Sequence, residues 1–195
     1  MHMLAIVLAL LAHAGASRAF SAVPFSDDDA QPPAANRRGE GIADVMVSRA
    51  RFQAMFGSPK VGDFVVYEVG KLEAKSDKSK LGKVRREIEQ AGQDFVIVHE
   101  VQELAGANSE NRWKVTRNDN VTGAGVPTVA KVSKPRKESV AVGSRKVECE
   151  LVEHTERGKI VLRRWTSAEV PFEGIVKEIQ ADGAGQRLVD FGRGK

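Results

Sequence analysis

The fold is decided by the C-terminal stretch GKIVLRRWTSAEVPFEGIVKEIQADGAGQRLVDFGRGK, residues Gly158–Lys195. A corner that holds Pro171 interrupts its apolar pattern once. The turn Asp182-Gly183-Ala184-Gly185 interrupts it again, and its glycines supply the positive φ that a tight hairpin needs. Strands this close in sequence favour antiparallel pairing. The stretch therefore predicts three successive strands, over Gly158–Trp165, Gly174–Ala181 and Gln186–Phe191.

Upstream of this stretch, short segments continue a period-two pattern. In Lys83–Glu89, for example, Val84 and Ile88 share one face while charged residues occupy the other. The strands are not separated by helix-length segments, which argues against a parallel nucleotide-binding sheet. We expect about eight or nine strands in one curved antiparallel sheet. The upstream segments are Asp63–Val69, Lys83–Glu89, Asp94–Val101, Arg112–Arg117, Val126–Ser133 and a returning stretch made of Val140–Val142 and Arg145–Glu153.

One segment, Gly41–Phe56, has helical periodicity and is followed by the breaker Gly57-Ser58-Pro59. An apolar helical stripe must be buried against something, and the sheet is the only candidate. The expected fold class is α+β and mostly β, a half-barrel with an N-terminal amphipathic helix packed on it. The stripe consists of Ile42, Val45, Met46, Phe52 and Phe56.

The N-terminal residues predict export. Met3–Ala12 is an apolar run too short for the roughly 20 residues that cross a bilayer. Small residues follow it in Ala14-Gly15-Ala16 and Ser17-Arg18-Ala19, which fit the rule for signal peptidase cleavage. We predict a signal peptide over residues 1–19, a flexible leader over 20–40 and a single domain over 41–195. The mature protein is then periplasmic or secreted, with no stable membrane span.

Composition narrows the class of protein. The chain has 195 residues, 42% hydrophobic and 29% charged, which is ordinary for one globular domain. Its net charge of +4 is spread along the chain and only 6% of residues are aromatic, which argues against a nucleic-acid partner. The single cysteine, Cys149, has no partner for an intramolecular disulfide. Because it shares a strand face with Val147 and Leu151, we expect it in the core.

The search for chemistry finds no catalytic or metal motif. His2 and His13 lie in the predicted signal peptide, and His99 and His154 lie on separate strands without a second ligand at zinc spacing. Gly123–Thr128 lacks the Lys-Ser or Lys-Thr of a phosphate loop, and no Gly-x-Ser-x-Gly elbow is present. We therefore expect no catalytic residue, no metal and no cofactor. A hydrolase with an unrecognised site is the least favoured alternative.

A longer pattern resembles a known group of proteins. Trp165–Lys177 reads WTSAEVPFEGIVK, a strand ending in Trp, a Val-Pro corner and a Gly-Ile-Val-Lys entry into the next strand. Together with GSRKVECE at Gly143–Glu150 and the closing Leu188–Gly192, it resembles the exported bacterial lipoprotein-carrier (LolA/LppX-like) half-barrel superfamily and related exported families. The resemblance implies a curved sheet whose hollow, partly plugged by helices, takes acyl chains or another hydrophobic partner. The carriers have several helices, whereas this chain has one.

Two hypotheses on function follow. The first is an exported, non-enzymatic binding or carrier protein for a lipid or other hydrophobic ligand. The second is a structural or interaction protein of the periplasm, with a filled core, no small-molecule ligand and an envelope protein as partner. An apolar cavity of several hundred Å3 favours the first. The residues expected to line such a site, with plain core packing as the alternative for each, are Phe52, Phe56, Phe64, Val66, Trp113 and Trp165.

Overall fold

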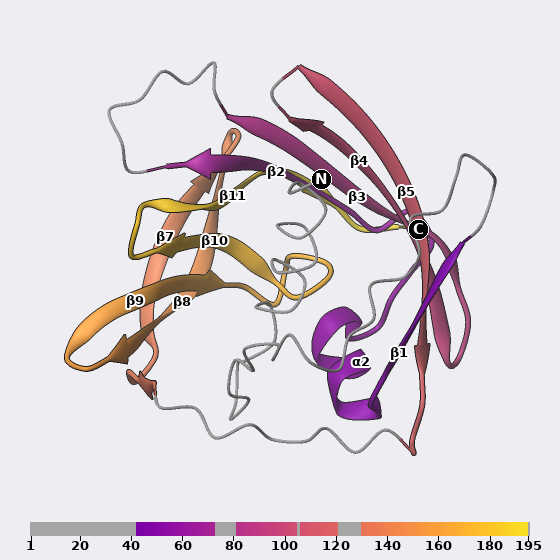
Figure 1. Cartoon of the computed structure of the whole chain (residues 1–195), viewed down its shortest axis with the longest axis horizontal. Helices are drawn as coiled ribbons and strands as arrows, with labels where there is room; N and C mark the ends of the chain where they lie inside the picture. Colours follow the sequence, from indigo (N-terminus) through magenta and orange to yellow (C-terminus); the bar gives the residue numbers. More distant parts are fainter. Residues whose placement is uncertain (1–41, 73–80, 105, 121–129, 195) are drawn as a thin grey trace, which may run out of the picture.

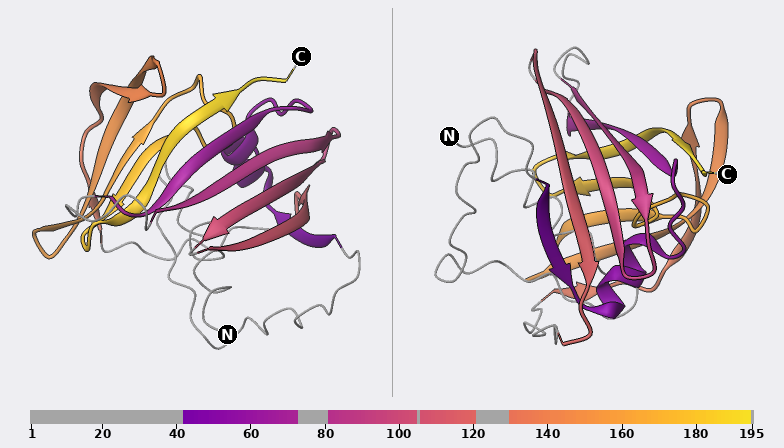
Figure 2. Two further views of the ribbon diagram at one scale, coloured as in Figure 1. Left: turned by 90° about the horizontal axis from the view of Figure 1, so that it is seen from above. Right: turned by 90° about the vertical axis from the view of Figure 1, so that its right-hand side faces the viewer.

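A computed structural model describes residues 42–72, 81–104, 106–120 and 130–194, which form one open, curved sheet with a helix inside the curve (Figures 1 and 2). The predicted signal peptide and leader lie outside the described residues. The elements are β1 (Ala43–Val47), α2 (Arg49–Phe56), β2 (Phe64–Lys71), β3 (Gly82–Ala91), β4 (Phe95–Leu104), β5 (Ala107–Arg117), β6 (Lys131–Val132), β7 (Arg136–Val142), β8 (Arg145–Glu156), β9 (Lys159–Thr166), β10 (Ile175–Gln180) and β11 (Ala184–Gly192).

The described residues make an 11-stranded sheet in the order β1-β5-β4-β3-β2-β11-β10-β9-β8-β6, with β7 paired to β8. Strands β2 to β5 and strands β8 to β11 are two antiparallel meanders. They become one sheet because the C-terminal strand β11 pairs with β2. The mostly β, curved character is as expected, but eight or nine strands was an underestimate. The strand that was missed is β1, within the segment expected to be helical, because its pairing with the distant β5 is not visible in a local pattern.

The C-terminal stretch folds into the three antiparallel strands β9, β10 and β11, as predicted. The connecting turn is tighter than expected, because Ala184 and Gly185 already belong to β11. Only Gly183 in this turn has a positive φ, at 80°. The Asp182 side chain closes the turn by accepting a hydrogen bond from the backbone N–H of Ala184 at 2.9 Å.

Within the segment Gly41–Phe56, which was expected to be one helix, the described residues form strand β1 over Ala43–Val47 and helix α2 only over Arg49–Phe56. It pairs in parallel with β5, with Val45 opposite Val115. Ser48 then caps α2 by accepting a hydrogen bond from the N–H of Arg51 at 3.3 Å, which places the helix start there. The apolar residues Ile42, Val45 and Met46 are therefore 47%, 43% and 63% exposed at a sheet edge, instead of buried on a helix.

The core forms two clusters that meet at one side chain. In one, Phe52, Met55 and Phe56 of α2 pack on Ile88 and on valines of β4 and β5. The other lies in the half built from β2 and β7 to β11 and includes Cys149, which is 4% exposed, as predicted. Phe172, from the corner between β9 and β10, packs against both clusters. This corner therefore joins the two halves of the core.

Candidate functional site

The corner between β9 and β10, residues 167–174, is folded inward and held by its own backbone. The N–H of Ser167 donates to the carbonyl oxygen of Gly174 at 2.8 Å. Pro171 is buried, and Phe172 has a φ of 59°, a conformation that is uncommon for a side chain of this size. The Phe172 ring lies 6.0 Å from the ring of Phe56, measured between centroids. Packing against α2 thus compensates the backbone strain and fixes the neighbouring residue, Glu173.

Gly174 is required at the end of this corner. Its φ is 70°, and an added Cβ would lie 2.7 Å from the backbone oxygen of Ser167. We expect Gly174→Ala to lower the free energy of unfolding by more than the roughly 1–2 kcal/mol of a left-handed residue alone. Gly158→Ala is the matched control, because Gly158 has a φ of 78° with nothing within 4 Å of the added Cβ. Urea unfolding of both variants checks this, and equal losses would contradict it.

A groove of about 1050 Å3 lies between the end of α2, the corner 167–174 and β8. Its lining includes apolar side chains that belong to the core: Phe56, Cys149, Val170 and Phe172. Its lining also includes exposed charged residues of both signs. The basic ones are Lys60, Lys137 and Arg193, and the acidic ones are Glu148, Glu150 and Glu169.

Glu173 lines this groove and also a small inner void of about 20 Å3, which is room for about one water molecule. Met55, Phe56 and Trp113 are among the other residues around the void. The residue as a whole is half-buried, yet its Oε1 atom is buried and has no hydrogen-bond partner. Burial raises the pKa of the Glu173 carboxyl from 4.5 to about 7, although nearby arginines act in the opposite direction. The carboxyl therefore gains and loses its proton near neutral pH.

Two buried ion pairs lie in the sheet near Glu173. Arg86 on β3 donates to Glu100 on β4 at 2.6 Å, and Glu100 also accepts from Gln102. Arg164 on β9 donates to Glu178 on β10, also at 2.6 Å. Each pair joins directly opposite residues of consecutive antiparallel strands. The interior of the curved sheet is thus partly ionic, not a purely apolar hollow.

Sequence reasoning missed these charges, although one sign was present. Arg86 occupies the position between Val84 and Ile88 on the otherwise apolar face of β3. A charged residue at a core position is unusual unless it is paired, so an arginine at this position indicates a buried acidic partner. The partner was not identifiable, because it depends on the register of β3 against β4.

The six residues expected to line a site do not converge. Phe52, Phe56 and Trp113 meet in the cluster around α2, and Phe56 also lines the groove. Trp165 lies in the other cluster, where its Nε1–H donates to Glu138 at 2.8 Å.

The remaining two, Phe64 and Val66, alternate along β2 with the buried Val65 and Tyr67, and therefore point to the opposite face. On that face the guanidinium of Arg85 lies 4.5 Å from the centre of the Phe64 ring. Neither residue lines the groove or the inner void.

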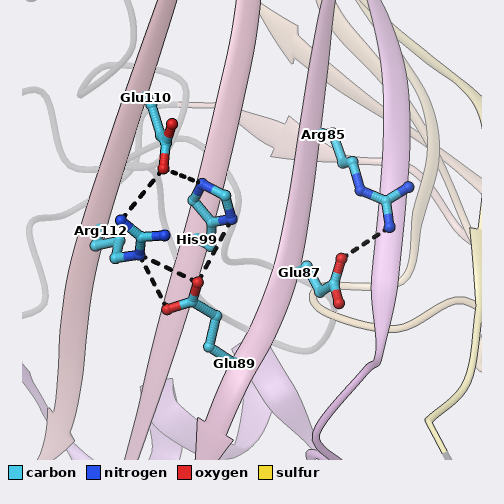
Figure 3. Close-up of polar contacts among 6 residues, drawn as sticks. All are labelled: Arg85, Glu87, Glu89, His99, Glu110 and Arg112. Carbon is cyan, nitrogen blue, oxygen red and sulfur yellow. Dashed lines mark hydrogen bonds and ion pairs between the residues drawn. The ribbon is translucent and has the colours of Figure 1, made fainter.

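His99 belongs to a charged cluster that bridges β3, β4 and β5 (Figure 3). Its Nε2 lies 2.9 Å from a carboxylate oxygen of Glu110, and its Nδ1 lies 3.6 Å from one of Glu89. Arg112 contacts both carboxylates, at 3.2 Å and 3.1 Å. The Arg112 guanidinium balances the charge of only one of the two carboxylates, and all four side chains are partly exposed, which is typical of a solvated sheet face.

His154 is separate from this cluster, on β8 in the other half of the sheet. It is buried, and burial lowers its pKa, with Arg164 contributing in the same direction. A neutral, buried imidazole is the expected state. Across the described ranges, no three side chains of His, Cys, Asp or Glu are grouped so that they could hold a metal ion.

Comparisons with known proteins leave the family open. No family model matches the chain, and neither a curated protein nor a solved structure matches it. The resemblance to lipoprotein carriers therefore stays a prediction. Within the part of the chain that is described, no helix is long and apolar enough to span a membrane.

Proposed function

We propose that this chain is an exported, non-enzymatic binding protein whose groove beside α2 takes an amphiphile with one acyl chain and a zwitterionic head group. The observation that carries the proposal is the composition of the groove, apolar side chains from the core bordered by exposed charges of both signs. Its volume of about 1050 Å3 is close to the upper end of the roughly 300–1,000 Å3 of ligand pockets.

The apolar part of the groove suits an acyl chain. Phe172 is partly exposed and presents ring surface to the groove, whereas Phe56, Val170 and Cys149 are 4%, 2% and 4% exposed and contribute little accessible surface. Covering apolar surface stabilises a bound chain by about 25 cal/mol for each Å2 removed from water. The Cys149 thiol behaves as one of these apolar groups, since burial raises its pKa to about 11.

The charged border suits a zwitterion better than a purely anionic head. Lys60, Lys137 and Arg193 would attract a phosphate or carboxylate, while Glu148, Glu150 and Glu169 would repel it and attract an ammonium group. A head that carries both charges is complementary to both sets. The ligand class that follows is a single-chain zwitterionic lipid, such as a lysophosphatidylcholine.

Titration calorimetry with lauroyl-lysophosphatidylcholine, kept below its micelle-forming concentration, tests the proposal. We expect saturable one-to-one binding to the mature protein. We also expect at least a tenfold loss of affinity in Ala54→Trp, because exposed Ala54 lines the groove and a tryptophan there would fill it.

Ala50→Trp places the same side chain at an exposed position of the same helix outside the groove lining, and should bind as the unmodified protein does. Non-saturable binding, or equal binding by both variants, would overturn the proposal.

A second candidate is an envelope interaction protein, favoured by the edge strand β1. Ile42, Val45 and Met46 are well exposed along an edge whose outer side pairs with no other described strand. Such an edge can receive a strand from another chain. Failure of the lysolipid to bind would leave this as the better account.

A further inference from the structure

We propose that ligand binding in the groove is coupled to protonation of Glu173, so that the groove holds an acyl chain when this carboxyl is neutral and releases it when the carboxyl ionises. The inference rests on the proposed function, because it concerns the same groove. It adds a regulated release step to what would otherwise be a passive binding site.

The position of Glu173 is the first argument. Its side chain lines both the groove and the inner void, and Phe56 and Phe172 also line both. Its Oε1 is buried without a hydrogen-bond partner, which is costly for a charged oxygen and tolerable for a neutral carboxyl. The hydrogen bond between the N–H of Ser167 and the carbonyl oxygen of Gly174 closes the corner next to Glu173 and fixes the backbone there.

The charged side chains around Glu173 come from strands β3, β9 and β10 and from helix α2, and most of them form ion pairs with other residues. Arg86 on β3 is paired with Glu100, and Arg164 on β9 is paired with Glu178 on β10. Arg51 on α2 and the Arg86 and Arg164 guanidinium groups lower the pKa of Glu173, while Glu178 raises it. Burial outweighs them all, which leaves the pKa at about 7. Tyr67 on β2 is also near, and stays neutral because burial raises its pKa.

The direction of the coupling follows from solvation. An acyl chain in the groove removes water from the side of Glu173 that faces it, and this disfavours the ionised carboxylate further. The complex therefore has a higher proton affinity than the free protein. By linkage, binding takes up protons, and affinity falls as pH rises through the range above about 7.

The test measures affinity for lauroyl-lysophosphatidylcholine at pH 5.5 and pH 8.5. This probe has a permanent ammonium and a strongly acidic phosphate, so its own charge is constant between these values. If the bound chain raises the Glu173 pKa by about one unit, the dissociation constant should rise roughly five- to tenfold between the two pH values. Calorimetry near pH 7.5, in buffers of different ionisation enthalpy, should detect uptake of a fraction of one proton.

Glu173→Gln should bind at both pH values as tightly as the unmodified protein binds at pH 5.5, without proton uptake. Glu103→Gln is the control, because Glu103 is an exposed carboxylate on β4 outside the groove lining and should leave both the affinity and its pH dependence intact. An unchanged pH dependence in Glu173→Gln, or pH-independent binding by the unmodified protein, would overturn the coupling and leave the binding function standing. Absence of lysolipid binding at every pH would overturn both.

Discussion

Replacing Arg86 by methionine should lower the free energy of unfolding by about 3–5 kcal/mol, the usual cost of removing one partner from a buried ion pair. The reason is the position of Glu100, whose side chain is 0% exposed and accepts hydrogen bonds from Arg86 and Gln102. Burial by itself lowers the pKa of Arg86, but Glu100 reverses this and keeps the guanidinium charged. Without Arg86, the carboxylate must be protonated or remain buried without its counter-charge.

The exposed pair on the same strand is the natural control for this prediction. Arg85 and Glu87 are in contact at 2.8 Å, with side chains 46% and 38% exposed (Figure 3). Arg85→Met should therefore lower the free energy of unfolding by no more than about 1 kcal/mol. A double variant, Arg86→Met with Glu100→Leu, should recover much of the loss, since it leaves no buried charge. Urea unfolding at pH 7 measures all three, and a cost for Arg86→Met as small as that for Arg85→Met would contradict the account.

Glu173→Gln should make the protein more stable at pH 8 by up to about 3 kcal/mol and leave stability near pH 4 almost unchanged. In the folded protein burial raises the pKa of this carboxyl to about 7, against 4.5 without burial. Between these values the unfolded chain has released its proton while the folded chain still binds it. The free energy of unfolding therefore falls as pH rises through this range, by up to about 1.4 kcal/mol per pH unit. Above pH 7 the loss of stability is complete.

Urea unfolding at pH 4, 6 and 8 checks this, with Glu169→Gln as the matched variant. Glu169 lies on the same corner but is exposed, so its amide should leave the pH dependence of stability as it is in the unmodified protein. The difference between Glu173→Gln and the unmodified protein should grow from pH 4 to pH 8. A difference that is constant across the three pH values would show that the carboxyl does not titrate in this range.

Local patterns in the sequence are sufficient to predict the secondary structure of much of the second half of the chain. The strands around Pro171 and Gly183 were predictable, because turn residues and period-two alternation are properties of neighbouring residues. The buried face of Val147, Cys149 and Leu151 was predictable for the same reason. The structure of the segment Gly41–Phe56 was not predictable in this way, because a few apolar residues at helical spacing also fit a short strand followed by a helix.

What the sequence determined by itself was therefore a mostly β chain with short antiparallel connections and its main turns. The tertiary structure alone decided that β11 pairs with β2, that Arg86 faces Glu100, and that Glu173 lies half-buried beside α2 with its Oε1 atom buried. These features join residues far apart in the chain, and pairing register and side-chain burial set them. Both are collective properties of the folded sheet, so no local stretch encodes them.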